Sequence, residues 1–255
     1  MPENHNPLPR VNVYIDGYNF YRPIQQKAEE TRDHRILHLA WCDYWALSSR
    51  LARRCFGDHQ MGAVKLFTAY ARDDVRRMLS PEGLQRKQIW LQAIQLASSG
   101  PVHISFGRWE LKPHDPRHPK EKLTDVKLAI SLVRDGLLAR GGWAVQAGHN
   151  SEHAYEDDDP ACPFDKAIVI SSDKDFLPAA EMVEKETKKN VVICFPFLST
   201  PYRLPLGYTI RTLEITAEDL QTCSLPDEIK REDGSRITWF DYVFSKGWPT
   251  LRGSR

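Results

Sequence analysis

Four aspartates in three separate clusters are the residues of this 255-residue chain whose types and spacing best suit chemistry. They are Asp16, Asp125, Asp173 and Asp175. In the first and third clusters an apolar, β-branched run ends in a carboxylate, as a buried parallel strand does when its carboxyl end carries a site. Carboxylates held close together repel one another, and a bound proton or divalent cation relieves that repulsion. Because hard oxygen donors favour Mg²⁺ or Mn²⁺, the pattern predicts metal-dependent phosphoryl transfer and, within that class, a nuclease.

A layered sheet is needed to bring these aspartates together, and the alternation of apolar runs with helical spacing predicts one. Strands are expected at 11–16, 62–70, 102–106, 166–170 and 191–195, with a short strand at 143–146 and a final extended segment at 208–215. Helices are expected at 18–31, 37–56, 81–98, 124–139 and 176–188. Residues 107–122 and 147–164 are expected to be loops, the second with a solvated acidic run at 156–159. The predicted fold class is α/β: three layers, Rossmann-like, around a central and mostly parallel sheet.

One domain at 11–219 is the preferred organisation, after a flexible N-terminus at 1–10 and before a C-terminal extension at 220–255. The extension is expected to pack on the core or to bind a protein partner, and a homo-oligomer stays open. The formal net charge of +1 provides no global field for nucleic acid, so any basic surface must be local.

Cysteine usage and hydropathy indicate the compartment. Five scattered cysteines without a C-x-x-C pair argue against a disulfide scaffold and against structural zinc, and suit a reducing cytosol. No apolar run reaches the ~18–20 residues that cross a membrane, and the polar N-terminus has no hydrophobic signal core. A soluble, cytoplasmic protein without a membrane partner is therefore expected.

The three clusters, taken in this order, resemble the NYN family, a branch of the PIN-like nucleases. The matching stretches are Asp16-Gly17-Tyr18-Asn19, Lys122-Leu123-Thr124-Asp125-Val126 and Ser171-Ser172-Asp173-Lys174-Asp175-Phe176. Ser172 stands where the family has a glycine, and Leu123-Thr124 stand where it has Gly-x, but neither departure removes a carboxylate. The resemblance covers residues 10–215, and it implies a metal-dependent ribonuclease on a compact PIN fold.

Three residues near the aspartates are candidates for positioning the ligands or binding phosphate. Asn19 lies one helical turn past Asp16, where its side chain could bond a ligand carboxylate or a substrate phosphate. Ser171 and Ser172 precede a helix N-terminus, whose free backbone N–H groups favour anions.

The expected loop before Asp125 supplies three more candidates for substrate binding. Lys122 and Arg108 could contact the phosphate backbone as cations, while Trp109 could stack a base. RNA is therefore the expected partner, with Mg²⁺ or Mn²⁺ as the cofactor.

Other interpretations stay open beside the nuclease. An aspartate before a helix is commonly just an N-cap, and Asp-Gly is commonly just a turn. A non-catalytic RNA-binding or scaffold protein could retain the fold, and a structure-specific DNA nuclease uses a related carboxylate site. A haloacid-dehalogenase-like phosphatase is disfavoured because Tyr18 stands where its second aspartate is needed. The identity of the RNA, endo- or exonuclease action, the number of metals and the pathway are not fixed by the sequence.

Overall fold

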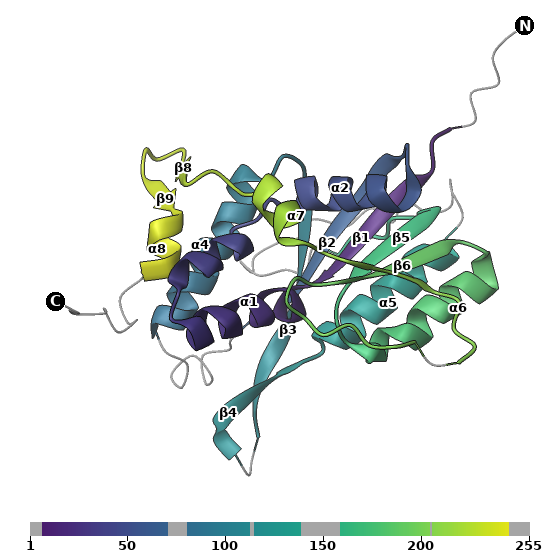
Figure 1. The fold of residues 1–255 in the computed structure, drawn as a ribbon, viewed down its shortest axis with the longest axis horizontal. Coiled ribbons are helices and arrows are strands. Elements are labelled where there is room, and N and C mark those ends of the chain that lie inside the picture. The colour runs from purple at the N-terminus through teal and green to yellow at the C-terminus, as the bar shows by residue number, and fades with distance from the viewer. Residues whose placement is uncertain (1–6, 71–80, 113–114, 139–158, 205, 245–255) are drawn as a thin grey trace, which may run out of the picture.

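The computed structural model describes residues 7–70, 81–112, 115–138, 159–204 and 206–244 (Figure 1). Its strands are β1 (Arg10–Asp16), β2 (Gln60–Tyr70), β3 (Val102–Lys112), β4 (Asp115–Lys122), β5 (Lys166–Ile170), β6 (Asn190–Phe195), β7 (Arg211–Glu214), β8 (Glu228–Lys230) and β9 (Arg236–Thr238). Its α-helices are α1 (Gly17–Thr31), α2 (Tyr44–Phe56), α4 (Pro81–Ala97), α5 (Thr124–Leu137), α6 (Leu177–Thr187), α7 (Ala217–Thr222) and α8 (Trp239–Phe244). Two 3₁₀ segments, η1 (His34–Ala40) and η2 (Lys174–Phe176), complete the described elements.

Seven strands form the main sheet in the order β4-β3-β2-β1-β5-β6-β7. The six strands from β3 to β7 pair in parallel, and β4 pairs with β3 in the antiparallel direction. The chain moves outward from β1 through β2 to β3, then returns to the other side of β1 and moves outward again from β5 to β7. This topology confirms the predicted α/β class and the mostly parallel sheet. The order reverses between β1 and β5, the point at which α/β sheets open a crevice for ligands.

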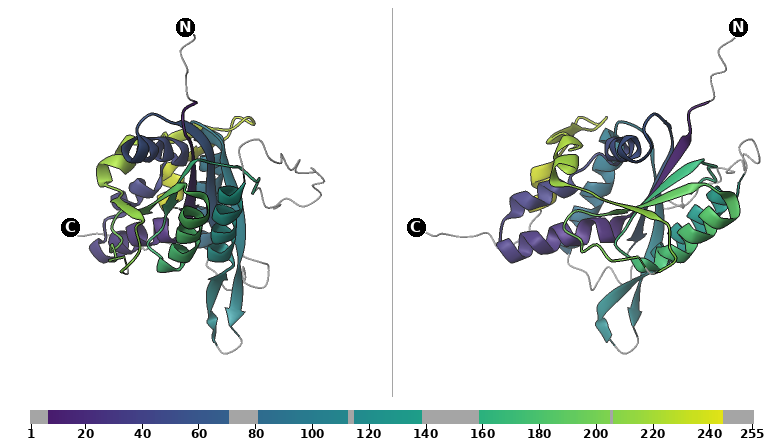
Figure 2. Two further views of the ribbon diagram at one scale, coloured as in Figure 1. Left: turned by 90° about the vertical axis from the view of Figure 1, so that its right-hand side faces the viewer. Right: turned by 45° about the vertical axis from the view of Figure 1, so that its right-hand side comes forward.

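Helices cover both faces of the sheet, which confirms the three-layer expectation (Figures 1 and 2). Side chains alternate along β1, so Val13 and Ile15 face the layer of α1, α2 and α4, whereas Tyr14 faces α5 and α6. Both faces of the central strands are buried, because parallel crossovers place helices on each side. The continuous apolar runs of β1 and β5 follow from that double burial.

The expected helix at 37–56 is wrong in its first third. Residues 34–40 form the 3₁₀ segment η1, and α2 begins only at Tyr44, where Asp43 accepts a hydrogen bond from Ala46 N at 3.0 Å as the N-cap. Between them the chain is extended, because Trp41 O accepts from Leu225 N at 3.0 Å and Asp43 N donates to Cys223 O at 2.7 Å. A distant segment of the chain therefore breaks the helix at this point. The extended segment expected at 208–215 is a strand only over Arg211–Glu214.

The expected loop at 107–122 is also wrong, since those residues continue β3 to Lys112 and return as β4. The two strands form an arm that projects from the body of the protein (Figure 1). Residues 107–122 show no alternation of apolar and polar residues, so the usual strand signal is missing. Pro116 and Pro119 fit this edge position, where proline blocks pairing with a further strand.

The described part of the C-terminal extension packs on the helices α1 and α4 and on η1. Leu225, Ile229, Ile237 and Tyr242 are buried in the same core as β1 and α1. The indole nitrogen of Trp41 donates to Pro226 O at 2.9 Å and so fixes the start of this segment. The strand expected at 143–146 lies outside the described residues. No helix of the described part of the chain is long and apolar enough to cross a membrane.

Candidate active site

Asp16 is the last residue of β1 and the N-cap of α1, and its carboxylate is held by groups from α1 and from the segment that follows β5. Only 1% of the residue is exposed. Its Oδ1 accepts from Asn19 N at 3.0 Å, and its Oδ2 accepts from Asn19 Nδ2 at 2.5 Å and from Ser171 Oγ at 3.0 Å. The following residue must be glycine, because a Cβ at Gly17 would lie 2.9 Å from Phe67 O. Close packing of β1 on β2 thus explains the Asp-Gly pair, and the N-cap interpretation of Asp16 is confirmed.

The segment after β5 is joined to the segment after β1 by hydrogen bonds. Ser171 Oγ, which donates to Asp16, also accepts from Asp173 N at 3.0 Å. Ser172 Oγ donates to Asn19 Oδ1 at 3.1 Å. The Asp173 carboxylate in turn caps η2, accepting from Asp175 N at 2.9 Å. The serines and Asn19 therefore align the two strand ends that carry the first and third acidic clusters.

Asp125 lies in the first turn of α5, which crosses the sheet in contact with β1 and β2 and approaches η2. Partial burial raises the pKa of Asp125 to about 6, with further contributions from the negative charges of Asp16, Asp173 and Asp175. All four aspartates predicted from the sequence therefore share one electrostatic neighbourhood. They come from three separate elements near the carboxyl edge of the sheet, beside the β1–β5 reversal.

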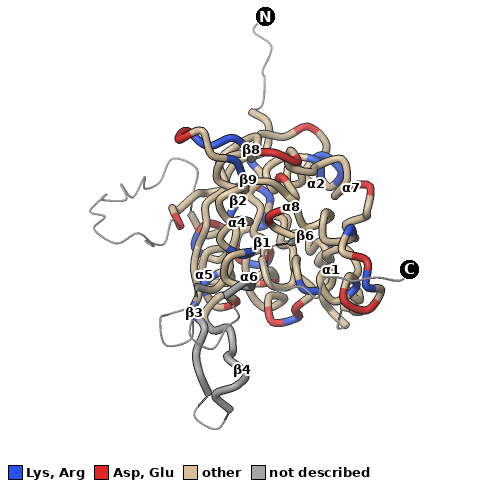
Figure 3. The backbone as a smooth tube through the Cα atoms, turned by 90° about the vertical axis from the view of Figure 1, so that its left-hand side faces the viewer, with Lys and Arg blue, Asp and Glu red and all other residues tan. Residues whose placement is uncertain are grey.

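The basic and aromatic candidates lie at the base of the arm. Arg108 in β3 is exposed and stands opposite Lys122 in β4, and Trp109 stands opposite Glu121. Lys122 is the last residue of β4, two positions before α5 begins, so the arm starts next to the helix that carries Asp125. Elsewhere Lys and Arg are interspersed with Asp and Glu along the described chain (Figure 3), in keeping with the net charge of +1.

The donor set suits a hard divalent cation, although the carboxylates do not form a closed cage. Among the described residues, no group of three or more His, Cys, Asp or Glu side chains has the arrangement of a preformed metal site. Partial burial is the main cause of the raised pKa of Asp125, and the charges of Asp16, Asp173 and Asp175 add to it, which indicates that these carboxylates lie in the same region. These two observations agree if the side chains are near one another but are oriented by hydrogen bonds rather than by a common ion. Mg²⁺ needs only one or two direct carboxylates and retains several waters, so the residues fit this ion.

Tyr202 is a neighbour of the site that the sequence interpretation missed. Its hydroxyl donates to Asp173 O at 3.3 Å, and Lys174 Nζ lies 5.2 Å from the centre of its ring. Burial, together with the charge of Asp173, raises the pKa of Tyr202 to about 12. The available signal was topological: Tyr202 follows β6, which adjoins β5, so its segment had to pass the same edge of the sheet.

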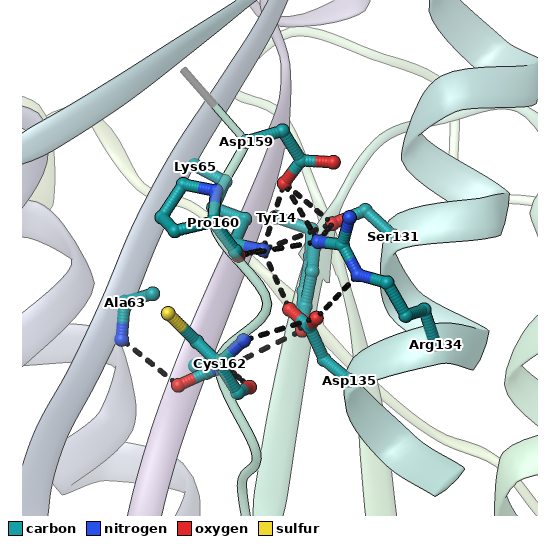
Figure 4. A network of polar contacts seen from close by, with 10 residues as sticks. Tyr14, Ala63, Lys65, Ser131, Arg134, Asp135, Asp159, Pro160 and Cys162 are labelled. Carbon is teal, nitrogen blue, oxygen red and sulfur yellow. Dashed lines mark hydrogen bonds and ion pairs between the residues drawn. The ribbon is translucent and has the colours of Figure 1, made fainter. Parts of the chain in front are cut away.

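A second polar cluster, also missed from the sequence, lies at the other end of α5 (Figure 4). Lys65 is 1% exposed, and its Nζ donates to Asp135 at 2.6 Å and to Asp159 at 2.8 Å. Arg134 pairs with both carboxylates at 3.0 Å. The expectation of a solvated acidic run is therefore wrong for Asp159; the rest of that run lies outside the described residues. A lysine within the apolar run of β2 was the signal in the sequence.

The fold and these contacts define an α/β protein with a carboxylate cluster at the reversal point of its sheet. No family model matches the chain, and no curated protein matches it. Among solved structures, the chain is similar to a protein of unknown function from Vibrio parahaemolyticus, with 16% sequence identity, 88% of this chain and 93% of that chain covered, and a TM-score of 0.34. Because that TM-score is too low to support an argument, the function must be argued from the site itself.

Proposed function

We propose that this protein is a metal-dependent ribonuclease that hydrolyses RNA phosphodiester bonds at the carboxyl edge of its sheet. The observation that carries the proposal is the bridge between the ends of β1 and β5. Ser171 Oγ, at 3.0 Å from Asp16 Oδ2, and Ser172 Oγ, at 3.1 Å from Asn19 Oδ1, align two acidic segments at the point where ligands bind in such sheets. The first turn of α5 adds Asp125 to the same place.

In this proposal Asp16, Asp125 and Asp173 hold the cation, with Asp175 contributing directly or through water. The bound ion supplies charge stabilisation at the scissile phosphate and lowers the pKa of an attacking water. Asn19 and Ser171 keep the Asp16 carboxylate fixed through three hydrogen bonds, so that the ligand needs no rearrangement. Most of the hydrogen-bonding capacity of these residues is spent inside the site, which favours a positioning role over direct contact with substrate.

The arm supports RNA as the substrate. Arg108 and Lys122 stand opposite each other in the β3–β4 pair, next to the helix that carries Asp125. Cationic residues bind the phosphate backbone and tryptophan stacks on unpaired bases, so Arg108, Lys122 and Trp109 are the residue types that single-stranded RNA would need here. We accordingly propose that a single-stranded RNA segment enters the site along the base of the arm, in the cytoplasm.

A non-catalytic RNA-binding protein is the second candidate, and one observation favours it. The carboxylates of Asp16 and Asp173 cap α1 and η2, so local structure alone could account for both residues. Asp125 is not a cap, because Leu123 is the N-cap of α5 and no side chain caps that helix; its local role is limited to the favourable interaction of a first-turn acid with the helix dipole, about 0.3–1 kcal/mol. Asp125 therefore distinguishes the two candidates.

The test is cleavage of labelled single-stranded and structured RNA in Mn²⁺, Mg²⁺ or EDTA, with matched DNA strands as competitors. The Asp125→Asn variant is compared with Asp58→Asn, which changes an exposed aspartate in the turn between α2 and β2. A ribonuclease loses cleavage in EDTA and in Asp125→Asn but not in Asp58→Asn. RNA that is bound but left intact by the wild-type protein in every metal would establish the binding protein instead. Preferential cleavage of DNA would identify a DNA nuclease.

A further inference from the structure

Tyr18 is an exposed aromatic residue in the first turn of α1, two positions after Asp16. Of this residue 47% is accessible, whereas Gly17 before it is buried and Asn19 after it is half-buried. Among the described residues, none hydrogen-bonds the hydroxyl of Tyr18, and no aromatic ring or cation lies against its ring. The contacts of the described chain therefore give this side chain no structural role.

The position of Tyr18 in α1 directs its ring toward the candidate site. Tyr18 is the second residue of the helix, and the Cα–Cβ bonds of a helix lean toward its N-terminal end. For α1 that end is the carboxyl end of β1, where Asp16 lies. Hydrogen bonds from Asn19 to Asp16 and from Ser172 to Asn19 fix the backbone of this turn. The ring of Tyr18 is therefore directed toward the carboxyl edge of the sheet from a backbone that is already held in place.

The arm begins at the same edge, as the register of the sheet shows. Asp16 pairs with Phe67, and Phe67 pairs with Ser105, so these three residues lie at one level across β1, β2 and β3. Arg108 follows Ser105 by three residues, which places it about 10 Å further along the strand, two strands away from β1. Tyr18 and the base of the arm therefore border one edge of the sheet (Figures 1 and 2).

One other exposed aromatic residue offers a comparison. Among the large hydrophobic residues that are exposed in the described chain, Tyr18 and Phe240 are the two aromatic ones. Phe240 belongs to α8 in the C-terminal extension, which contacts α4 and η1. Single exposed apolar residues are common on protein surfaces, so exposure alone means little. What distinguishes Tyr18 is its place beside the aspartates, and Phe240 serves as a matched control.

We propose that Tyr18 binds the RNA substrate by stacking on an unpaired base next to the phosphate at the carboxylate site. This inference rests on the RNA site of the proposed function and adds to it a requirement for an accessible base. Every nucleobase has a π-face, so the contact tolerates different sequences, but a base paired in a duplex is not available for it. The hydroxyl has no part in stacking, so a phenylalanine at this position suffices.

The experiment measures the affinity of the full chain for a short labelled single-stranded RNA by fluorescence anisotropy in Ca²⁺, a hard cation that takes oxygen ligands. A gel verifies that the RNA stays intact. Tyr18→Ala is expected to weaken binding about tenfold, whereas Tyr18→Phe and Phe240→Ala bind as the wild-type protein does. Duplex RNA is expected to bind the wild-type protein and Tyr18→Ala equally, because its bases are already stacked. Circular dichroism and the thermal midpoint verify that each variant is folded.

Abasic substitution in the RNA supplies a second measurement that does not depend on the stability of a variant. Removal of one base at a time should cost the wild-type protein about tenfold in affinity at one position, and should cost Tyr18→Ala nothing there, because the stacking partner is already absent. The inference is overturned if Tyr18→Ala binds single-stranded RNA as tightly as the wild-type protein, or if both lose the same affinity at every abasic position. A wild-type protein that binds no RNA also overturns it. Cleavage in Mn²⁺ or Mg²⁺ tests the ribonuclease proposal separately, so RNA that is bound through Tyr18 but left intact would refute that proposal alone.

Discussion

The two ends of α5 carry acidic residues in opposite electrostatic situations. At the last turn, Asp135 is fully buried, and together with Asp159 it faces two cations, Lys65 and Arg134. At the first turn, partial burial raises the pKa of Asp125 to about 6, and the charges of Asp16, Asp173 and Asp175 add to that rise. Among the described residues, the cluster at the last turn is neutralised by its own cations, whereas the charges that act on Asp125 are those of three other aspartates. One helix thus carries a buried, ion-paired acid at its last turn and an exposed acid near other carboxylates at its first.

The charged groups of the cluster at the last turn of α5 also have neutral hydrogen-bond partners. Lys65 Nζ also donates to Pro160 O at 2.6 Å, and Asp135 accepts from Tyr14 OH at 2.8 Å and from Cys162 N at 3.2 Å. These bonds fasten residues 159–162 to α5 and β2. Burial and the charge of Asp135 raise the pKa of Tyr14 well above its usual value, so its proton stays in this network. A cluster with its charges paired and its donors engaged is expected to contribute to stability and not to bind ligands.

The largest expected effect is on activity and comes from a change at the first turn of α5. Asp125→Asn should lower metal-dependent RNA cleavage at least a thousandfold, about 4 kcal/mol of transition-state stabilisation, because a carboxylate near the ion is lost. The free energy of unfolding in urea should be equal or higher at pH 7, since a charge repelled by three carboxylates is removed. Stability lost in parallel with activity would show that Asp125 is structural, and the contrast between the two ends would disappear.

A somewhat smaller effect, on stability alone, is expected at the last turn of α5, where Lys65 pairs with Asp135. Lys65→Met should lower the free energy of unfolding by about 3 kcal/mol, because Asp135 stays buried with Arg134 as its remaining cation. The double variant Lys65→Met/Asp135→Leu should recover only part of that loss, since it removes the under-neutralised charge but leaves Tyr14 OH and Cys162 N without their acceptor. Urea denaturation measures both. If the double variant were less stable than Lys65→Met, the network would contribute more than the neutralisation of Asp135.

Sequence reasoning predicted where Asp16 and Asp173 lie in the sheet but missed the partners of Lys65, and the difference has a physical reason. Asp16 and Asp173 directly follow apolar strands, so a local pattern places them at the same edge of a parallel sheet. The partners of Lys65 lie 70 and 94 residues further along the chain, and no local pattern joins them. The arm was missed for a related reason, because residues 107–122 carry no apolar period that would predict strands. Elements that follow from a local apolar period were predictable from the sequence, whereas contacts between residues far apart in the chain were not.

The stability of the protein should depend on pH through the ionisation of Asp159, which pairs with Lys65 and Arg134. Burial raises the pKa of Asp159, but hydrogen bonds and charge from Lys65 and Arg134 outweigh it, so the net shift is downward. An acid with a lowered pKa stabilises the fold above the pKa it has when unfolded, about 3.9, and this contribution is lost as the pH falls through the folded-state pKa. At pH 7, Asp159→Asn should therefore cost about 2 kcal/mol through weakened charge-assisted hydrogen bonds.

Urea unfolding of wild type and Asp159→Asn from pH 7 downward measures this difference. The two curves should converge in acid once the pH lies below the folded-state pKa of Asp159, where the aspartate is protonated in both states. Glu186→Gln, an exposed acid on α6, serves as the control that shows no such difference. A gap that stays constant with pH would mean that packing at this position, and not charge, accounts for the loss.

The smallest expected effect tests whether the four aspartates near the first turn of α5 bind a cation from solution. Mn²⁺ at ten times its dissociation constant should stabilise the wild-type protein by about 1.4 kcal/mol, because a ligand that binds only the folded state shifts the unfolding equilibrium. Asp159→Asn should gain the same increment, since the paired cluster has no need of a cation, whereas Asp173→Asn should gain little or none. The thermal midpoint with Mn²⁺ or EDTA measures all three. Equal stabilisation of Asp173→Asn would place the ion away from the sheet edge, and the excess of carboxylates there would need another explanation than a metal.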